Sequence, residues 1–409
     1  MMSQLSLTSM DVKGKTVLVR IDLNVPMQKG KVSDDMRIRR ILPTLRYLAE
    51  KGARVVLLSH FGRPKGQYEP SMSLAPMVDL LQSYLPGLTV HFGVDCLGLS
   101  AREAVDNTPC GHIILLENLR FHWQEETSDT SFAKNLAALG DIYVNEAFSC
   151  SHRSHASIVG IPRYLPSCMG LAFEEEISTL ETFLHTPQRP LMAIVGGAKV
   201  STKLALLENL VEKVDRLFIG GAMANTFLHV MGHDLGASRL ERDMKEIVRR
   251  VIRSAEEAGC KIILPVDLVV AIELDVHAPC KVVEVHAVPE TSMALDIGPA
   301  TLNALAAEIA QCKMLVWNGP VGAFETSPFD TSTVQLARIV AKNTADGNLR
   351  SVAGGGDTVS ALTHAGLLEE FTYLSTAGGA FLEWLEGKAL PGIAALGQWE
   401  SKGKKAEVG

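Results

Sequence analysis

The sequence predicts an α/β protein with mostly parallel sheets, divided between two domains. A chain of 409 residues is too long to form one hydrophobic core. Short apolar, β-branched runs alternate with helical stretches along the chain. These runs are continuously apolar, which is typical of strands that helices cover on both faces.

Four of the expected strands lie in the first half of the chain and six in the second. They cover residues 16–21, 54–58, 112–116, 141–144, 191–195, 216–219, 261–264, 313–317, 350–353 and 371–374. Between the two sets, residues 171–190 predict an amphipathic helix that ends at Thr-Pro-Gln-Arg-Pro. This segment is the expected domain junction, with domains over 1–170 and 191–391.

Composition argues against several classes of protein. The net charge of −7 and the pI near 6.0 do not favour a nucleic-acid binder. The seven cysteines form no Cys-x-x-Cys pair, so neither a zinc site nor a redox dithiol is indicated. The start of the chain lacks the features of a signal peptide, and the apolar stretch 217–233 contains glycines, Asn225 and two histidines. We therefore expect a cytoplasmic protein without a membrane partner, and a monomer by default.

Arginines and histidines follow the strand ends in the first half. Asp22 and Asn24 flank Leu23, so their side chains point the same way from an extended backbone and can bind a hydroxyl group. The alternative is a simple turn before Pro26. His60 and Arg63 lie in a loop before Pro64 that is suited to a phosphate or carboxylate.

Five arginines are expected to converge on the same anion. They are Arg37, Arg39 and Arg40 on one short segment, with Arg120 and Arg153 at later strand ends. A phosphorylated carboxylic acid would satisfy such a cluster, whereas a lone arginine is usually a surface residue. His152 and His155 have no evident orienting carboxylate and are interpreted as residues that line the site.

Glycines follow the strand ends in the second half. The chain contains neither the Walker pattern nor the Gly-x-Gly-x-x-Gly pattern. Instead, Gly196 and Gly197 precede Lys199 and Lys203, which would share one face of a helix that begins here. A phosphoryl group between the two ammonium groups would relieve their repulsion, but two solvated surface lysines are the alternative.

A second glycine run precedes an aspartate. Residues 354–356 are glycines that could present backbone amides to a phosphate, and Asp357 could then hold Mg²⁺. The alternative is a common aspartate helix cap. Glu325 could accept hydrogen bonds from a ribose or could be an exposed loop carboxylate.

Together these segments resemble the phosphoglycerate kinase family, from about Val12 to about Leu396. The matching motifs are widely spaced and in order: Arg-Ile-Asp-Leu-Asn-Val-Pro (20–26), Ser-His-Phe-Gly-Arg-Pro-Lys-Gly (59–66), Leu-Glu-Asn-Leu-Arg-Phe (116–121), Ala-Lys-Val-Ser-Thr-Lys (198–203), Trp-Asn-Gly-Pro (317–320) and Gly-Gly-Gly-Asp-Thr (354–358). The resemblance implies two Rossmann-like domains, each a mostly parallel sheet with helices on both faces, joined by a helical hinge. In such a fold, residues 392–409 would return to the first domain.

The resemblance also implies a role for individual residues. 3-Phosphoglycerate would be bound by Asp22, Asn24, Arg37, His60, Arg63, Arg120 and Arg153. The adenine nucleotide would be bound by Lys203, Asn318, Glu325, Gly355, Gly356, Asp357 and Thr358, with Asp357 on the side of Mg²⁺. Arg37, Lys199 and Lys203 would surround the phosphoryl group during direct transfer from ATP, and the two domains would close to bring the ligands together.

Three positions depart from the family pattern. Glu146 stands where aspartate is usual, Ser149-Cys150-Ser151 replaces a stretch with more glycine, and Ala377 replaces a glycine. None of these changes removes a charged ligand, although Ala377 could crowd a phosphate and lower turnover. A non-catalytic nucleotide sensor and a kinase for a different acyl phosphate are the alternative functions, which the intact lysine and arginine sets argue against.

Overall fold

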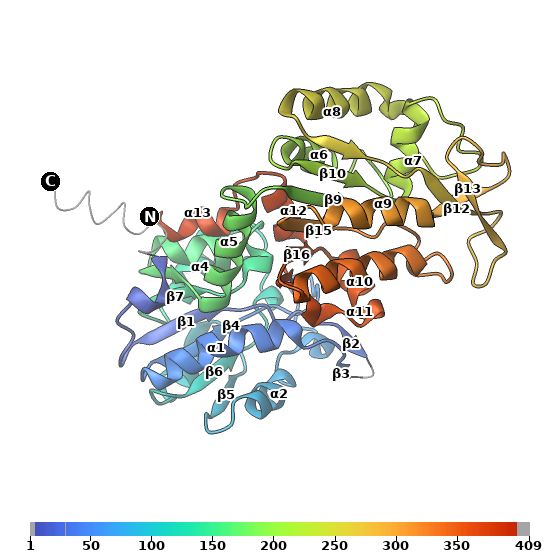
Figure 1. Cartoon of the computed structure of the whole chain (residues 1–409). Coiled ribbons are helices and arrows are strands. Elements are labelled where there is room, and N and C mark those ends of the chain that lie inside the picture. The colour runs from blue at the N-terminus through green and yellow to red at the C-terminus, as the bar shows by residue number, and fades with distance from the viewer. Residues whose placement is uncertain (1–4, 29, 399–409) are drawn as a thin grey trace. The chain divides into compact units, whose positions relative to one another are not determined.

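The computed structural model describes residues 5–28 and 30–398, so the part of the expected returning tail from residue 399 onward lies outside the described residues. The chain divides into two compact units (Figure 1). Unit 1 takes its residues from Met1–Ser178 and Ala389–Gly409, and unit 2 is Thr179–Lys388. The chain therefore enters unit 2 once and returns to unit 1.

The sheet of unit 1 has six strands in the order β5-β6-β4-β1-β7-β8, and every pairing is parallel. Its strands are β1 (Thr16–Arg20), β4 (Arg54–Leu58), β5 (Val90–Gly93), β6 (Ile113–Leu116), β7 (Ile142–Asn145) and β8 (Ser167–Met169). The central strands are buried almost throughout, as their apolar runs predict. The order places the ends of β6, β4, β1 and β7 side by side at one edge.

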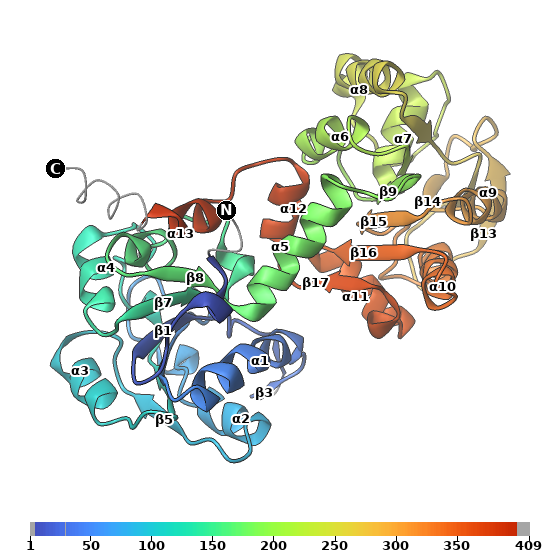
Figure 2. The same cartoon turned by 60° about the vertical axis from the view of Figure 1, so that its left-hand side comes forward.

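Helices surround this sheet, as Figure 2 shows. They are α1 (Met36–Glu50), α2 (Met77–Tyr84), α3 (Gly98–Asp106), α4 (Thr130–Ala137) and α13 (Pro391–Leu396). The returning helix α13 packs on the 156–160 helical turn, and the Gly392 amide donates to the Ser151 carbonyl over 2.8 Å. That contact joins the end of the described chain to the segment that follows β7.

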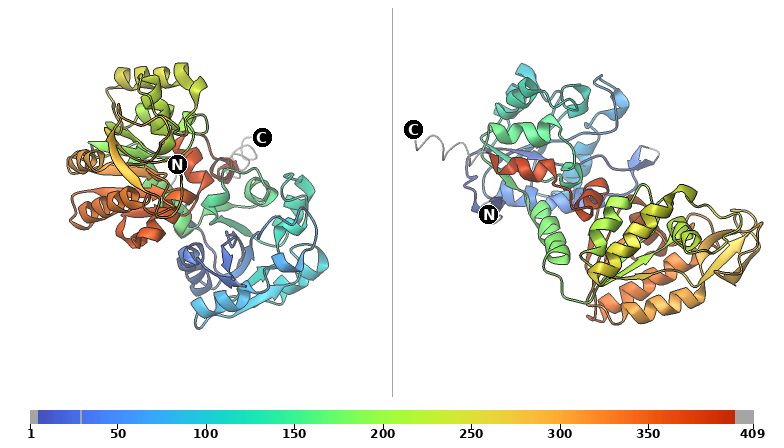
Figure 3. Two further views of the ribbon diagram at one scale, coloured as in Figure 1. Left: turned by 90° about the vertical axis from the view of Figure 1, so that its right-hand side faces the viewer. Right: turned by 90° about the horizontal axis from the view of Figure 1, so that it is seen from above.

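Unit 2 repeats the design with a second parallel sheet, in the order β11-β10-β9-β15-β16-β17. Its strands are β9 (Leu191–Val195), β10 (Arg216–Ile219), β11 (Lys261–Ile263), β15 (Met314–Asn318), β16 (Arg350–Gly354) and β17 (Tyr373–Ser375). Its helices are α6 (Leu204–Val211), α7 (Gly221–Val230), α8 (Lys245–Ala258), α9 (Pro299–Ile309), α10 (Thr331–Ala345), α11 (Gly356–Ala365) and α12 (Gly379–Leu385), and they flank the sheet in the views of Figure 3. The predicted α/β class with mostly parallel sheets is confirmed.

Every run predicted as a strand contains one, with ends shifted by at most two residues. The prediction missed the short edge strands β5 and β8 and all of the antiparallel structure. The latter comprises a sheet of unit 2 in the order β13-β12-β14 and a hairpin of unit 1: β12 (Asp267–Ala271), β13 (Cys280–Glu284), β14 (Met293–Ile297), β2 (Met27–Gln28) and β3 (Lys31–Val32). Strand β13 is mostly exposed and the hairpin is largely so, which explains why neither produces a continuous apolar run.

Helix α5 (Leu171–Leu184) occupies the predicted junction 171–190. It begins in unit 1, and its last residues, from Thr179, belong to unit 2. Its buried face includes Phe173, Ile177 and Leu180. None of the helices among the described residues could span a membrane. The apolar stretch 217–233 contains most of β10 and all of α7.

Candidate active site

The candidate site of unit 1 lies at the carboxyl ends of neighbouring strands. Asp22 follows β1, His60 follows β4, Arg120 follows β6 and Arg153 follows β7. Ligands of open α/β sheets bind at this edge because the loops that leave it converge there. The strand order thus brings together residues from four distant motifs.

Asp22 is the centre of a hydrogen-bonded network. Its carboxylate accepts hydrogen bonds from Arg37 Nη1 over 3.1 Å and from the Ser149 hydroxyl over 2.5 Å. Burial would raise the pKa of Asp22, but Arg37, the Ser149 hydroxyl and Arg20 bring it below the ordinary value. Asp22 is therefore a carboxylate that fixes the side chains around it.

Asn24 connects the first motif to the second. Its side-chain oxygen accepts a hydrogen bond from the Gly62 amide over 3.0 Å, and Arg37 Nη1 donates to its backbone carbonyl over 2.9 Å. The Ser59 hydroxyl accepts from the Leu23 amide over 2.9 Å. These hydrogen bonds therefore join segment 22–24 to segment 59–62.

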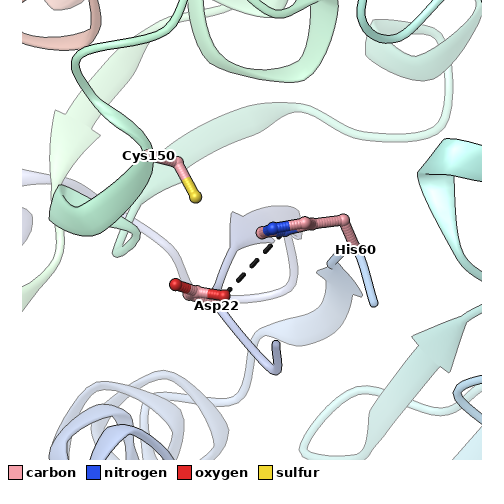
Figure 4. Close-up of side chains that lie close together, drawn as sticks. All are labelled: Asp22, His60 and Cys150. Atoms are coloured by element: carbon pink, nitrogen blue, oxygen red, sulfur yellow. Dashed lines mark ion pairs between the residues drawn. The ribbon is translucent and has the colours of Figure 1, made fainter. Parts of the chain in front are cut away.

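His60 lies close to both Asp22 and Cys150, and Figure 4 shows the three side chains turned toward one another. The Nδ1 atom of His60 is 3.9 Å from Asp22 Oδ1 and 3.1 Å from Nη2 of the buried Arg20. Because a guanidinium group only donates hydrogen bonds, Nδ1 accepts and the ring proton is on Nε2. Burial and the nearby Arg20 hold the pKa of His60 well below its usual range.

We expect His60 to remain neutral, with its proton on Nε2, at pH 5.5. The guanidinium group at Nδ1 opposes a second proton, and burial adds to that effect. Long-range ¹⁵N–¹H NMR spectra of the imidazole groups would test this, with a His60→Gln variant to identify the signal. An imidazolium signal from His60 at pH 5.5 would contradict the assignment.

The arginine cluster is smaller than predicted. Arg120 is buried and donates to the Gly62 carbonyl over 2.7 Å, and Arg20, Arg120 and Arg153 lie close enough to His60 to oppose its protonation. Arg63 is exposed. The predicted convergence of Arg39 and Arg40 on this site is wrong, because successive residues of a helix point in different directions. Arg39 pairs with Asp35 over 2.9 Å, and Arg40 lies 3.4 Å from Glu176.

The loop after β7 has two histidines with different surroundings. His155 Nδ1 lies 3.9 Å from Glu125, and burial together with Arg20 and other nearby cations lowers its pKa to about 3. His152 accepts from Arg153 Nε over 3.3 Å. The carboxylate of Glu125 beside His155 corrects the expectation that neither histidine would have one nearby. The role of the two histidines as lining residues stays a prediction.

In unit 2, the side chain of Lys203 reaches the ends of β9 and β15. Its ammonium group donates to the Gly196 carbonyl over 2.7 Å and to Asn318 Oδ1 over 2.6 Å. Burial lowers the pKa of Lys203 to about 8, although the nearby Asp357 acts to raise it.

The expected helix over Lys199 to Lys203 is wrong: α6 begins at Leu204, and Lys199 is exposed in the preceding loop. Gly196 lies against the backbone of Gly319 and Pro320, and Glu241 holds Ser201 over 2.5 Å, so this loop is fixed in a non-helical form.

A second network joins the ends of β15 and β16. The Asn318 amide nitrogen donates to the Gly354 carbonyl over 2.8 Å, and the Gly319 amide donates to the Thr358 hydroxyl over 2.7 Å. Gly355 has φ +101° and lies against Asn318, so a side chain would be both strained and crowded there. These contacts leave Gly356 and Asp357 exposed at the start of α11.

A cavity of about 380 Å³ opens beside this network. Glu325 and Asp357 both line it, and Arg239 and Asn225 contribute further polar groups. The remaining wall includes Asp296, and its other residues are mostly glycines and apolar side chains. Sequence reasoning identified Gly197 but missed Gly221, Pro265, Leu268, Leu274, Met293, Leu295, Asp296 and Val321. The Gly-Gly pair at 220–221 after β10 is the signal that could have identified part of this wall, because it repeats the pattern of glycines after a strand.

The departures from the family pattern leave this geometry intact. Ser149 supplies a hydrogen bond to Asp22, and Cys150 is buried beside His60. Ala377 is buried, and it is not among the described non-glycine residues with positive φ. A methyl group at position 377 therefore imposes no backbone strain.

Comparisons with known proteins agree with this geometry. A sequence model of the family "Phosphoglycerate kinase" matches residues 7–388. The phosphoglycerate kinase of Methylobacterium radiotolerans is 56% identical over 385 residues, which cover 94% of this chain and 96% of that protein. The corresponding enzyme of Ruegeria sp. strain TM1040 is 54% identical and covers 96% of this chain and 98% of its own length. The solved structure of phosphoglycerate kinase from Coxiella burnetii is 42% identical, with a TM-score of 0.87 over 96% of this chain and 99% of that one.

Proposed function

Since this chain belongs to the phosphoglycerate kinase family, we propose that its two units divide the substrates of that reaction between them. The reaction is the reversible transfer of a phosphoryl group between ATP and 3-phosphoglycerate, which gives 1,3-bisphosphoglycerate and ADP. It is the ATP-forming step of glycolysis. The chain is thus a kinase with a carboxyl group as the phosphoryl acceptor.

Unit 1 would hold 3-phosphoglycerate at the carboxyl edge of its sheet. Asp22 and Asn24 would bind the hydroxyl group, while His60, Arg63, Arg120 and Arg153 would bind the charged groups. The observation that supports this most directly is the set of guanidinium groups around a neutral His60. Such a site neutralises an anion and keeps a neutral donor on Nε2 for it.

Unit 2 would hold the adenine nucleotide in its cavity. Leu268, Leu274 and Met293 offer an apolar wall for the base, and Glu325 can accept from the ribose hydroxyls. The amides at the start of α11, with Gly355, Gly356 and Thr358, would meet the phosphates. Asp357 is an exposed carboxylate at this point, which fits Mg²⁺ held by one carboxylate and by nucleotide phosphates. When bound, Mg²⁺ would neutralise charge on the phosphates.

The chain's own residues would then transfer the phosphoryl group by position and charge. Arg37, Lys199 and Lys203 would surround it, and Asn318 would orient Lys203 through the 2.6 Å hydrogen bond. The acceptor carboxylate attacks directly, without a phosphoenzyme, so the two ligands must come into contact. We infer from this requirement that the units close on each other when both ligands are bound.

Closure predicts a measurable compaction. We expect 3-phosphoglycerate and MgATP together to lower the radius of gyration in small-angle X-ray scattering, while either ligand alone has a smaller effect. Because the units are joined through α5 and the return at Ala389, this change reports their relative movement. An unchanged radius with both ligands at saturation would contradict closure. The scattering data would also give the molecular mass and so test the proposal that this cytoplasmic enzyme is a monomer.

The decisive test of the function is ATP- and Mg²⁺-dependent conversion of 3-phosphoglycerate, coupled to NADH oxidation through glyceraldehyde-3-phosphate dehydrogenase. Robust turnover is expected. Nucleotide binding without turnover would favour a nucleotide sensor, and turnover with another carboxylic acid alone would favour a different acyl-phosphate kinase. Omission of Mg²⁺ is expected to abolish activity, which tests the requirement for the metal.

A further inference from the structure

The first three backbone amides of α5 are capped by side chains from outside the helix. Such amides have no partner within a helix and must find acceptors elsewhere. The Leu171 amide donates to the Thr44 hydroxyl over 2.9 Å. The Ala172 and Phe173 amides donate to the two carboxylate oxygens of Glu146, over 3.1 and 3.0 Å. Two residues, from α1 and from the end of β7, therefore hold the start of the helix that runs from unit 1 into unit 2.

This cap is closely fitted. Thr44 also donates to the Glu146 carboxylate, so both capping side chains fix each other. Gly170 has no space for a Cβ atom, because that atom would meet the Glu146 carboxylate. Glu146 is 5% exposed and Thr44 is fully buried. The carboxylate therefore has one well-defined position against the backbone at the start of α5.

In the part of the chain that the structure describes, no cation is among the groups that shift the pKa of Glu146. On α5, Glu174 accepts from Ser6 over 2.7 Å, Glu175 raises the pKa of Glu146, and Glu176 lies 3.4 Å from Arg40 of α1. On β8, the buried Cys168 has a pKa raised by burial and by Glu146. The amides of α5 and the Thr44 hydroxyl are thus what stabilises the carboxylate.

Glu146 immediately precedes the segment 147–153, which contributes side chains to the candidate substrate site. Glu146 is followed by Ser149, which donates to Asp22 over 2.5 Å, and by Arg153. Its own amide donates to the Arg20 carbonyl over 2.9 Å, and Arg20 contacts His60. A displacement of Glu146 would therefore shift both the start of α5 and Arg20, which contacts His60.

We propose that Glu146 is a positioning residue for phosphoryl transfer, which holds the inter-unit helix α5 in register with the substrate segment 149–153. This inference rests on the proposed closure of the units. The carboxylate of Glu146 reaches two amides of α5 at once. Glu146 touches no reacting atom, and its effect is exerted through the helix.

Protonation would weaken this cap. Burial raises the pKa of Glu146 to about 7, although Thr44 and the two amides favour the charged form. A protonated carboxyl group offers a donor where an acceptor is needed. We therefore expect kcat to fall as the pH decreases through 7, in proportion to the protonated fraction of Glu146.

The test compares variants by kcat and KM for each substrate from pH 5.5 to 8.5. Glu146→Gln has the same shape but only one acceptor atom, and we expect it to lower kcat about tenfold at pH 8 while both KM values stay within twofold. Glu146→Asp retains the carboxylate and is expected to recover at least half of wild-type kcat. Glu175→Gln removes the same charge from an exposed position just after the first turn of α5 and is the matched control.

The pH profile separates positioning from simple destabilisation. The limb of kcat near pH 7 should be absent in Glu146→Gln. It should be present in Glu175→Gln but displaced to lower pH, because Glu175 raises the pKa of Glu146. Wild-type kcat in folded Glu146→Gln, an equal loss in Glu175→Gln, or a loss confined to KM would overturn the proposal. If Glu146→Gln does not fold, Thr44→Val should lower kcat in the same way and Thr44→Ser should not. Scattering of the wild type alone decides whether the units close, so a failure of closure is distinguishable from a failure of the role of Glu146.

Discussion

Replacement of Lys203 by alanine is expected to lower kcat by about 10³-fold without loss of the fold. Lys203 supplies an ammonium group at the junction of β9 and β15, where Gly196 and Asn318 hold it at 2.7 and 2.6 Å. The substitution leaves two acceptors unsatisfied, which we expect to cost about 1–3 kcal/mol in the free energy of unfolding. Coupled kinetics at saturating substrates and thermal unfolding measure the two effects separately.

Lys342→Ala is the matched control for this experiment. Lys342 is an exposed lysine in the last turn of α10, within the same unit. Its removal changes the net charge equally but should leave kcat within twofold of wild type. Near-normal turnover in Lys203→Ala would refute the catalytic role of Lys203, and equal losses in both variants would indicate a general effect of charge.

Arg37→Ala is expected to lower kcat/KM for 3-phosphoglycerate by about 10²- to 10³-fold and to leave the KM for ATP within twofold. Arg37 Nη1 binds both Asp22 and the Asn24 carbonyl, so its loss removes a cation and loosens the segment that holds the substrate hydroxyl. Steady-state kinetics with each substrate varied in turn would measure this, together with calorimetric binding of 3-phosphoglycerate.

Arg39→Ala provides the comparison for Arg37. The two arginines are two residues apart on α1, but Arg39 pairs with Asp35 and lies over the Tyr84 ring. We expect its removal to change kcat/KM by less than twofold, because exposed ion pairs contribute little. A large kinetic effect of Arg39→Ala would show that the arginine cluster converges on the substrate after all.

The motifs predicted the residues of the candidate site better than they predicted its geometry. Asp22, Asn24 and His60 form a network from strand ends that the apolar runs already located. The helix start before Lys203 was wrong, because the contact of Gly196 with Gly319 and Pro320 competes with helix formation. That contact joins segments over 120 residues apart in sequence, so no local pattern records it.

Supporting residues were the main omission. The sequence marks Arg20 only as one residue of a motif, yet the side chain is fully buried and sets the ring tautomer of His60. Glu146 was noted as a departure from a pattern, whereas its carboxylate caps α5. Both roles depend on partners from other elements, such as Thr44, which precedes Glu146 by 102 positions.

The sequence by itself determined the strands of the two parallel sheets, the position of the helix between the units and the motifs at the strand ends. These features are local, because a buried strand needs only a short continuous apolar run and a turn after it. Only the tertiary structure decided which strands are neighbours, that Arg37 and not Arg39 faces Asp22, and that Glu146 holds α5. Those outcomes depend on the packing of segments that are distant in the chain, and a buried polar group takes its role from the partners that packing brings to it.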